Sequence, residues 1–277
     1  MSKGQLVSVI LTTRNEQDVI KRVLLSIIRQ TYKNIEIILI DNNSKDRTCE
    51  IAKVYTKKVF NFGPERSAQR NFGAKQAKGE YLLFLDADMR LTKNVLLECV
   101  KLIKKDSKIG AVTILEESKA KTFWEKIKAY ERSFYNLEGD VITDAARFFP
   151  TRIFKQLGGY DESITGPEDW DLTDNIIKLG YKIEIAKSLI YHYEYIPSIF
   201  ALVKKKFYYG LKSYRYLFKQ QVSIISPKTV YFLRPIFYRR WKRLFQHPVL
   251  TTGLLLMLII EQMSGMAGYL CGRITRQ

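Results

Sequence analysis

The chain has 277 residues, of which 46% are hydrophobic and 27% are charged. This composition excludes an intrinsically disordered chain, and the length suits one large domain or a domain with an appendage. The formal net charge is +18, but residues 201–277 carry fourteen Lys and Arg against one acidic residue, Glu261. Because these basic residues are interleaved with Tyr, Phe and Trp and lead into an apolar stretch, they favour binding to an anionic membrane surface over a nucleic acid.

The three cysteines, Cys49, Cys99 and Cys271, are widely spaced and form no Cys-x-x-Cys pair. An odd number of isolated cysteines indicates a reducing compartment and no zinc site.

The first ninety residues alternate between strand and helix patterns. Residues 6–12 form an apolar strand pattern, and apolar residues then recur at helical spacing from Val19 to Ile28. A second strand pattern, 34–41, ends in Asp41, and Asp46 is a plausible N-cap for a helix that continues to about Val54. This alternation, with polar residues at each strand end, predicts an α/β fold with a doubly wound, parallel sheet.

The segment 81–90, YLLFLDADMR, predicts a buried central strand that ends in two carboxylates, Asp86 and Asp88. Open α/β sheets bind ligands in the crevice beyond the carboxyl ends of their strands. Hard oxygen ligands suit Mg²⁺ or Mn²⁺, which in turn suits a phosphate ligand. The alternative for an isolated Asp-x-Asp is a solvated acidic turn.

The sequence contains no Gly-x-Gly-x-x-Gly after the first strand and no Gly-x-x-x-x-Gly-Lys-Ser/Thr. Their absence argues against a dinucleotide-dependent dehydrogenase and a P-loop enzyme. A nucleotide would therefore be held by side chains at strand ends, and its phosphates by a metal. A predicted helix, 66–78, brings Arg70 close in sequence to Asp86.

A second acidic cluster follows a Gly-Pro turn: Glu168, Asp169 and Asp171 surround Trp170 at the start of a predicted helix. The helix dipole stabilises acids in a first turn, which explains one of the three. A carboxylate oriented in a cleft is what deprotonation of a hydroxyl nucleophile requires.

Histidine is rare in this chain. His192 ends an apolar strand-like run and is either a third metal ligand or a core residue, whereas His247 lies in the basic tail beside a proline. Between these motifs we expect a helix over 93–105, a strand over 109–115 and an aromatic-rich helix over 123–137. The aromatic residues of that helix either line an acceptor groove or pack in the core.

Together these motifs resemble family 2 glycosyltransferases with the GT-A fold, over about residues 5–195. The resemblance rests on residues 12–16 (TTRNE), 41–48 (DNNSKDRT), 70–74 (RNFGA), 86–88 (DAD), 158–162 (GGYDE), 168–170 (EDW) and His192. It implies a GT-A catalytic domain over 1–200 with a mostly parallel, doubly wound sheet, a nucleotide half at about 1–90 and an acceptor half at about 91–200. Residues 201–277 would form a helical, membrane-associated extension.

The resemblance also implies roles for individual residues. A UDP- or GDP-sugar donor would be held by Thr12, Arg14, Glu16, Asp41, Asn43, Arg70 and Asp86. A divalent cation, Mn²⁺ or Mg²⁺, would bind Asp88 and His192, and Asp86 would bind either the ribose or the metal. Asp169 would be the general base, with Glu168 as an alternative or helper and Trp170 in the acceptor site. Transfer would invert the sugar in a single displacement.

This sequence differs from two groups within the family, and both differences bear on the expected acceptor. Processive synthases of the family carry Gln-x-x-Arg-Trp soon after the catalytic acid. Here Phe237 takes the Gln position before Arg240-Trp241, about seventy residues after Asp169, which favours transfer of one sugar. Polyprenyl-phosphate mannose synthases usually lack the Glu-Asp-Trp motif, which favours a glycan acceptor linked to a lipid.

The apolar stretch 249–271 is interrupted by Glu261, Gln262, Gly265 and Gly268. A spanning helix needs about twenty apolar residues, and a charge at mid-bilayer is costly. A single span, interfacial or re-entrant helices, and a helix packed on the soluble domain or in a homo-oligomer all stay open. Either membrane arrangement places the enzyme at the cytoplasmic face of the cell membrane.

Two other function classes stay open. A glycosyltransferase that acts directly on a polyprenyl phosphate would not need Asp169, because a phosphate nucleophile needs no base. A basic membrane-binding or nucleic-acid-binding scaffold with a GT-A-like fold would lack catalytic chemistry.

Overall fold

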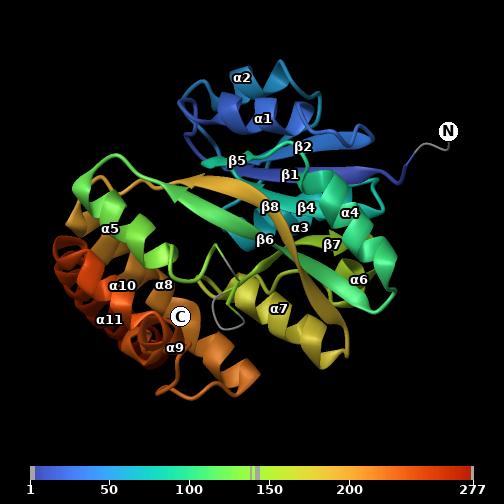
Figure 1. Ribbon diagram of the computed structural model, residues 1–277. Coiled ribbons are helices and arrows are strands. Elements are labelled where there is room, and N and C mark those ends of the chain that lie inside the picture. Colours follow the sequence, from blue (N-terminus) through green and yellow to red (C-terminus); the bar gives the residue numbers. More distant parts are fainter. Residues whose placement is uncertain (1–3, 138, 141–143, 276–277) are drawn as a thin grey trace. The chain divides into compact units, whose positions relative to one another are not determined.

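The computed structural model describes residues 4–137, 139–140 and 144–275, which pack into two compact units (Figure 1). The chain passes between the units several times. The first unit comprises Met1–Glu116, Ala145–Glu162 and Leu172–His192, and the second comprises Glu117–Asp144, Ser163–Asp171 and Tyr193–Gln277. By packing, the second unit thus includes two whole stretches before the predicted boundary at residue 200, and its last segment begins at Tyr193, also before that boundary.

One eight-stranded sheet runs through the fold in the order β3-β2-β1-β4-β7-β6-β8-β5. The strands are β1 Val7–Thr13, β2 Ile35–Asp41, β3 Val59–Asn61, β4 Tyr81–Asp86, β5 Met89–Leu91, β6 Ile109–Lys119, β7 Ala146–Pro150 and β8 Lys182–Tyr193. The α/β class predicted from the strand-helix alternation is confirmed.

Strands β3, β2, β1 and β4 pair in parallel, with Thr13 opposite Asp41 and Thr12 opposite Asp86. The carboxyl ends of these strands therefore meet at one edge, as the polar residues at each strand end predict. Beyond β4, the neighbours β6 and β8 also run in the same direction, because the N–H groups of Lys182 and Glu194 donate to the carbonyls of Lys108 and Lys119. The antiparallel pairs are β4 with β7, β6 with β7, and β5 with β8. In the last of these pairs Met89 lies opposite His192, which brings His192 next to Asp88.

Helices of the first unit cover both faces of the parallel strands. They are α1 Ile20–Ile28, α2 Thr48–Lys53, α3 Arg66–Gln76, α4 Val95–Lys105, α6 Thr151–Gln156 and most of α7 Glu168–Lys178. Because alternate strand residues point to opposite faces, Val9 and Leu11 pack with α1 and α4, while Ile10 packs with α3 and α7. A Cβ atom on Gly73 of α3 would lie 2.5 Å from Ile10, so the helix approaches the sheet closely only because this residue is glycine.

The second unit is mainly helical. Its helices are α5 Phe123–Arg132, α8 Ile199–Gln220, the 3₁₀ turn η1 Tyr231–Leu233, α9 Pro235–Arg239, α10 Trp241–Gln246 and α11 Pro248–Thr275. Tyr130, Phe134 and Tyr135 are buried in its core, so these aromatics pack in the interior, and α5 ends earlier than the expected residue 137. Arg132 pairs with Glu194 at 3.0 Å, which ties α5 to the chain that leaves β8.

Helices α8 and α11 pack with their backbones in direct contact. A Cβ atom on Gly268 would lie 2.1 Å from the carbonyl oxygen of Phe207, and one on Gly272 would lie 1.8 Å from that of Leu211. The Gly-x-x-x-Gly spacing of α11 is therefore used for close helix packing. By length and composition, α11 is also long and apolar enough to cross a membrane.

Candidate active site

The turn after β2 is built around Asp41. Its buried carboxylate accepts hydrogen bonds from the hydroxyl of Thr13 at 2.8 Å and from the backbone N–H and hydroxyl of Ser44 at 2.7 and 2.6 Å. The donor-binding candidate Asp41 thus shapes the loop over the parallel strand ends. Another candidate, Asn43, has a left-handed backbone with φ of 51° and is joined to Asn61 of β3 through its side chain and its backbone N–H.

The loop after β1 carries two further donor-binding candidates. The side chain of Arg14 is exposed, whereas Glu16 is half-buried. Burial, followed by the negative charges of Asp88 and Asp86, raises the pKa of Glu16 to about 7. Since these charges are close enough to affect Glu16, the predicted strand-end residues share one electrostatic environment.

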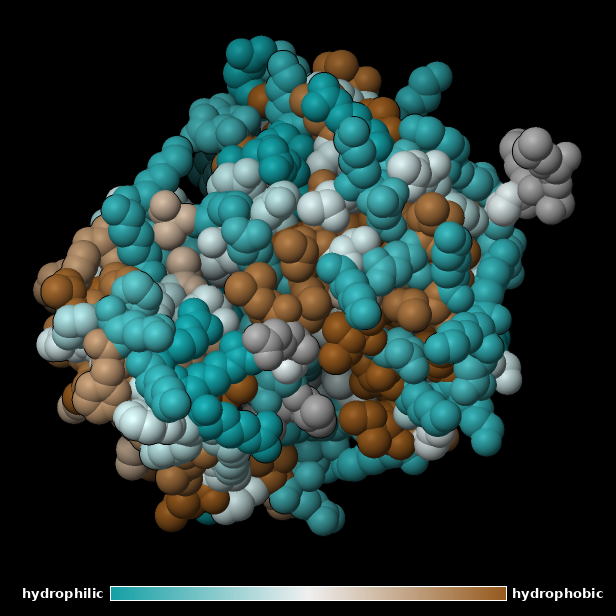
Figure 2. Space-filling view, in the orientation of Figure 1, coloured by the Kyte–Doolittle hydropathy of each residue, from teal (hydrophilic) through white to brown (hydrophobic). Residues whose placement is uncertain are grey.

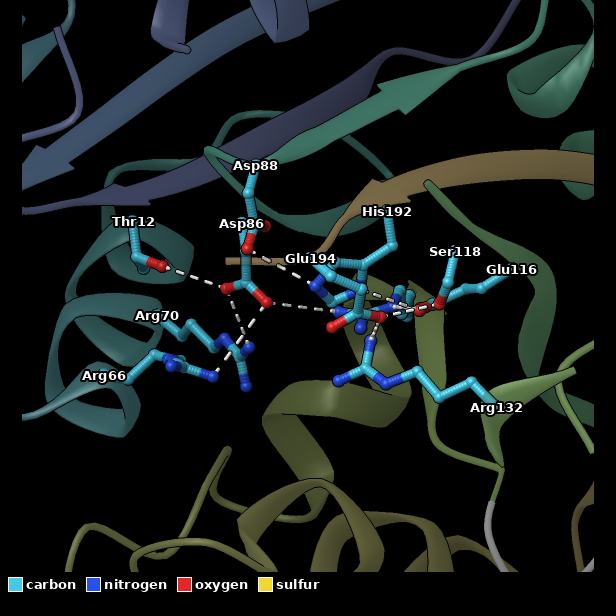
Figure 3. Close-up of polar contacts among 11 residues, drawn as sticks. Thr12, Arg66, Arg70, Asp86, Asp88, Glu116, Ser118, Arg132, His192 and Glu194 are labelled. Atoms are coloured by element: carbon cyan, nitrogen blue, oxygen red, sulfur yellow. Dashed lines mark hydrogen bonds and ion pairs between the residues drawn. The ribbon is translucent and has the colours of Figure 1, made fainter. Parts of the chain in front are cut away.

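Three arginines converge on Asp86 (Figure 3). The Oδ1 atom of Asp86 lies 3.2 Å from Nη2 of Arg70 and 3.4 Å from the hydroxyl of Thr12. Its Oδ2 atom lies 3.9 Å from Arg66 and 3.8 Å from Arg147. Burial would raise the pKa of the Asp86 carboxyl, but these guanidinium groups outweigh burial and hold the pKa well below its usual range.

Arg70 is fully buried, and its guanidinium lies over the ring of Tyr160, with 5.1 Å to the ring centre. Arg66, one helical turn earlier, is 43% exposed. The arginines therefore leave one cation accessible at the strand ends, where a diphosphate could meet it. The carboxylate of Asp86 offsets part of the positive charge of the three arginines.

Asp88 faces His192, and His192 faces Glu116 (Figure 3). Nε2 of His192 lies 3.3 Å from Oδ2 of Asp88, and Nδ1 lies 3.1 Å from Oε2 of Glu116. The other oxygen of Glu116 accepts a hydrogen bond from Nε of Arg147 at 2.7 Å. Burial would raise the pKa of Asp88, but the charge of His192 lowers it.

The residues around Asp88 fit a divalent cation only in part. Among the described residues, no group of three or more His, Cys, Asp or Glu side chains is arranged to hold a metal ion. Within the same part of the chain, however, the buried Oδ1 atom of Asp88 has no hydrogen-bond partner. An unsatisfied buried carboxylate oxygen beside an imidazole suits a cation such as Mg²⁺, which commonly takes only one or two protein ligands and completes its shell with substrate phosphates and water.

The first turn of α7 carries the second acidic cluster. Asp169 and Trp170 are half-buried, while Glu168 is 5% exposed. Asp171 accepts hydrogen bonds from Lys219 at 2.8 Å and from Gln220 at 2.6 Å, which fixes α7 to the end of α8 within the second unit. Trp170 lies near Tyr216, with 6.4 Å between ring centres. Asp171 thus has a structural role in the second unit.

Sequence reasoning missed three residues of the first unit: Arg66, Glu116 and Arg147. Arg66 carries a signal, because a residue four positions before Arg70 lies on the same helical face. Glu116 and Arg147 carry none, because they reach the site from β6 and β7, whose antiparallel pairing was not predicted.

The model of the glycosyl transferase family 2 matches residues 8–157, and this chain belongs to that family. A glycosyltransferase of Rickettsia typhi, RT0329, is 30% identical over 189 residues, which is 63% of this chain and 59% of the relative. MJ1057 of Methanocaldococcus jannaschii is 28% identical over 92% of this chain and 93% of its own length. The chain spans less than two thirds of each of the Rickettsia relatives.

A shorter match, 39% identical over 89 residues, joins 30% of this chain to 36% of WfaP from Escherichia coli. WfaP is a β-1,3-glucosyltransferase that uses UDP-Glc and α-D-GlcNAc-diphosphoundecaprenol.

Two solved structures share the fold. The mannosyltransferase PcManGT from Pyrobaculum calidifontis, in complex with GDP-Man and Mn²⁺, has a TM-score of 0.62 at 16% identity and covers 98% of this chain and 88% of its own. Residues 1–349 of TarS from S. aureus, in complex with UDP, have a TM-score of 0.55 at 17% identity and cover 98% of this chain and 91% of their own. The likeness confirms the GT-A type of α/β fold predicted from the motifs.

Proposed function

We propose that the protein transfers one sugar from a UDP- or GDP-sugar to a hydroxyl of a lipid-linked glycan, with inversion, at the cytoplasmic face of the cell membrane. The observation that carries the proposal is the group of carboxylates and arginines at the carboxyl ends of β1, β2 and β4, centred on Asp86 and Asp88. Ligands of open α/β sheets bind at this edge. Membership of the glycosyl transferase family 2 supports the reaction class.

The donor is assigned to the first unit. Asp41, Asn43 and Glu16 border the strand ends where the base and ribose would lie, with Thr12 near the end of β1 and Arg14 on the loop that follows. Arg70 holds Asp86 in place, and the more exposed Arg66 is positioned to meet the diphosphate. Two proteins with a similar fold are seen with such ligands, PcManGT with GDP-Man and TarS with UDP. These ligands support a nucleotide-linked sugar as the donor, but they do not decide between uracil and guanine as its base.

Asp88 and His192 would hold the divalent cation, with Asp86 next to it. The cation supplies positive charge that stabilises the diphosphate as it leaves. Glu116 would keep the Nδ1 proton of His192 engaged, so that the lone pair of Nε2 faces Asp88 and the metal position. Carboxylates that orient metal-binding histidines in this way raise metal affinity.

Asp169 is assigned as the general base. The acceptor oxygen attacks C1 of the sugar as the bond from C1 to the diphosphate oxygen breaks, the hydroxyl proton passes to Asp169, and the nucleoside diphosphate leaves. Glu168 is the alternative base, and Trp170 would contact the acceptor sugar. WfaP, whose acceptor is a diphosphoundecaprenol-linked sugar, supports a lipid-linked glycan as the acceptor class.

Donor binding is tested first by thermal denaturation of the full chain with a panel of nucleotide sugars, each with and without Mn²⁺. A ligand that binds only the folded state raises the unfolding temperature. We expect one UDP- or GDP-sugar to raise it in the presence of Mn²⁺, and less without Mn²⁺. If no nucleotide sugar shifts the transition under either condition, the non-catalytic scaffold replaces this proposal.

The chemical roles are tested with the donor so identified. We expect Asp88→Asn and Asp169→Asn to keep the wild-type unfolding temperature and to lower transfer by about a thousandfold, since each removes one group that acts in the transition state. Asp18→Asn, at an exposed acid in the turn before α1, serves as the control. If Asp169→Asn transfers sugar at the wild-type rate to a polyprenyl phosphate, the acceptor is that phosphate and Asp169 is not the base.

A further inference from the structure

One face of α11 is apolar and exposed along most of its length. The exposed side chains recur every three or four residues, at Leu256, Ile259, Met263, Met266, Leu270 and Ile274. We call these six residues the outer stripe. Hydrophobic side chains are visible over α10 and α11 in the space-filling view (Figure 2). An apolar stripe this long, about 27 Å at 1.5 Å per residue, is unlike the scattered apolar residues of an ordinary soluble surface.

The opposite face of α11 is tied to the second unit by charge. Glu261, near the middle of the helix, is 1% exposed and forms ion pairs with Lys128 of α5 at 2.6 Å and with Lys206 of α8 at 3.2 Å. The glycine contacts with α8 lie along the same helix. Insertion of α11 alone across a bilayer would break these pairs, place a carboxylate near mid-bilayer and leave the buried Lys128 and the half-buried Lys206 without it.

Helix α8 would not cross the bilayer with α11. It carries Lys204, Lys205 and Lys206 in succession, followed by Lys212, Arg215 and Lys219. Charged side chains within a hydrocarbon layer are costly, and six on one helix exceed what snorkelling can relieve. The packed pair α8 and α11 can therefore meet a membrane only along its surface.

The surroundings of the outer stripe match an anionic lipid surface. Lys204, Lys205, Arg239, Lys242 and Arg273 are exposed, and the described residues from 201 onward include no acid except the buried Glu261. Tyr238, Trp241 and Phe245 are exposed on α9 and α10. Aromatic rings of this kind favour the boundary between headgroups and acyl chains, and each nearby Lys or Arg adds attraction to anionic lipid.

A groove between α8 and α11 adjoins the stripe. It has a volume of about 760 Å³ and is lined mainly by apolar side chains: Phe200, Ala201, Val203, Phe207, Met263 and Ala267. Lys204 also borders it, and Met263 belongs to both the groove and the outer stripe. An acyl chain with an anionic headgroup fits this combination of an apolar groove and a neighbouring ammonium group.

We propose that the second unit inserts the outer stripe of α11 into one leaflet of an anionic bilayer, with α11 parallel to the membrane and not across it. This inference deepens the proposed membrane location and rests on it. It can fail while the proposed transfer holds, because donor binding is assigned to residues of the first unit.

The full chain is tested by co-sedimentation with vesicles of phosphatidylcholine alone or with about one third phosphatidylglycerol. We expect binding to the anionic vesicles, and at least tenfold weaker binding for Ile259→Lys/Met266→Lys, because each lysine removes an apolar anchor. Val54→Lys, at a 78% exposed apolar position on α2, is the matched control and should bind like the wild type. Equal binding by the stripe variant and the wild type would overturn the proposal.

The orientation of α11 is tested with single reporters at its two ends, Gln246→Cys and Thr275→Cys, in a chain whose Cys49 and Cys271 are replaced by serine. A membrane-impermeant maleimide is applied to sealed right-side-out and inside-out membrane vesicles from expressing cells. We expect both reporters to react only in the inside-out preparation. Reaction of the two reporters from opposite sides would show a spanning helix and overturn the proposal.

A second copy of the chain is the competing occupant of the stripe. Sedimentation velocity distinguishes a dimer from a monomer. The proposal would be overturned if the wild type is a dimer that the Ile259→Lys/Met266→Lys variant dissociates and if the wild type does not bind anionic vesicles. The donor-induced thermal shift of the same variant should equal that of the wild type. Failure of vesicle binding with an intact thermal shift would therefore reject this inference alone.

Discussion

Two buried or half-buried carboxylate groups in this protein are surrounded by cations, and they differ in whether the surrounding charges satisfy them. Around Glu261, each oxygen lies within ion-pair distance of a lysine, although neither oxygen makes a hydrogen bond within the described residues, and Lys128 and Arg234 also contact Glu131. Around Asp86 and Asp88, Asp86 is matched by three arginines, but a buried oxygen of Asp88 has neither an ion-pair partner nor a hydrogen-bond partner within the described residues.

This difference distinguishes charged side chains that stabilise the fold from charged side chains that can bind a ligand. A buried ion pair that is closed on itself contributes to one packing arrangement and strongly resists the loss of either partner. A carboxylate that is partly exposed, electrostatically perturbed and incompletely satisfied can bind something else. The side chain of Glu261 is 1% exposed, whereas those of Asp86 and Asp88 are 19% and 37% exposed.

The largest expected effect comes from removing the charge of Glu261, which breaks its ion pairs with Lys128 and Lys206. Glu261→Gln leaves the buried Lys128 and the half-buried Lys206 with less opposing charge, so we expect the free energy of unfolding to fall by about 3–5 kcal/mol. Urea denaturation followed by circular dichroism measures it. Glu50→Gln, which breaks the exposed pair with Arg47, is the control and should leave the midpoint unchanged. An unaltered midpoint for Glu261→Gln would mean that the network does not stabilise the fold.

The same network should also respond to acid. Burial alone would raise the pKa of Glu261, but Lys128 and Lys206 lower it to about 2. A carboxylate with a depressed pKa in the folded state contributes stability that is full above its ordinary value of 4.5 and is lost as the pH falls towards 2. The stability difference between the wild type and Glu261→Gln should shrink over that range.

An intermediate effect is expected at the incompletely satisfied site. Glu116→Ala removes the hydrogen-bond partner of His192 Nδ1, so we expect Mn²⁺ affinity to fall by about 10–100-fold. Glu116→Gln should retain a higher Mn²⁺ affinity than Glu116→Ala, because its amide oxygen can still accept the hydrogen bond from His192. Electron paramagnetic resonance titration of Mn²⁺ measures affinity without relying on turnover. Glu117→Ala, the next residue of β6, is the control, and equal Mn²⁺ affinities in Glu116→Ala and Glu117→Ala would remove the positioning role.

The smallest effect concerns Glu16, whose pKa burial and the charges of Asp88 and Asp86 raise to about 7. The folded state then keeps a proton that the unfolded state loses above pH 4.5, so stability falls as the pH rises from about 4.5 to 7. After discounting for solvent screening of a half-buried group, we expect about 1 kcal/mol. Urea midpoints of the wild type and Glu16→Gln at pH 5 and pH 8 test this. Identical pH slopes would contradict it.

Local sequence patterns were sufficient for the first half of the fold. The strands that end at Thr13, Asp41 and Asp86 and the helices between them follow from apolar runs and amphipathic spacing, since these elements are consecutive and pair in parallel. The N-cap of α2 is Arg47 and not the predicted Asp46, although Asp46, one residue earlier, accepts a hydrogen bond from the backbone N–H of Thr48 at 3.0 Å. The roles assigned to Asp169 and to the donor-binding residues stay predictions.

The sequence by itself determined which residues gather at the carboxyl ends of the parallel strands, because strand direction follows from strand-helix alternation. Only the tertiary structure brought Glu116 to His192 and Arg147 to Asp86, because β6 and β7 join the sheet beside strands that are distant in sequence, in an order and register that no local pattern specifies. The same holds for α11. Its composition fits a membrane span, but the ion pairs of Glu261 with Lys128 and Lys206 come from helices distant in sequence, and they decide which face of α11 lies inside the protein.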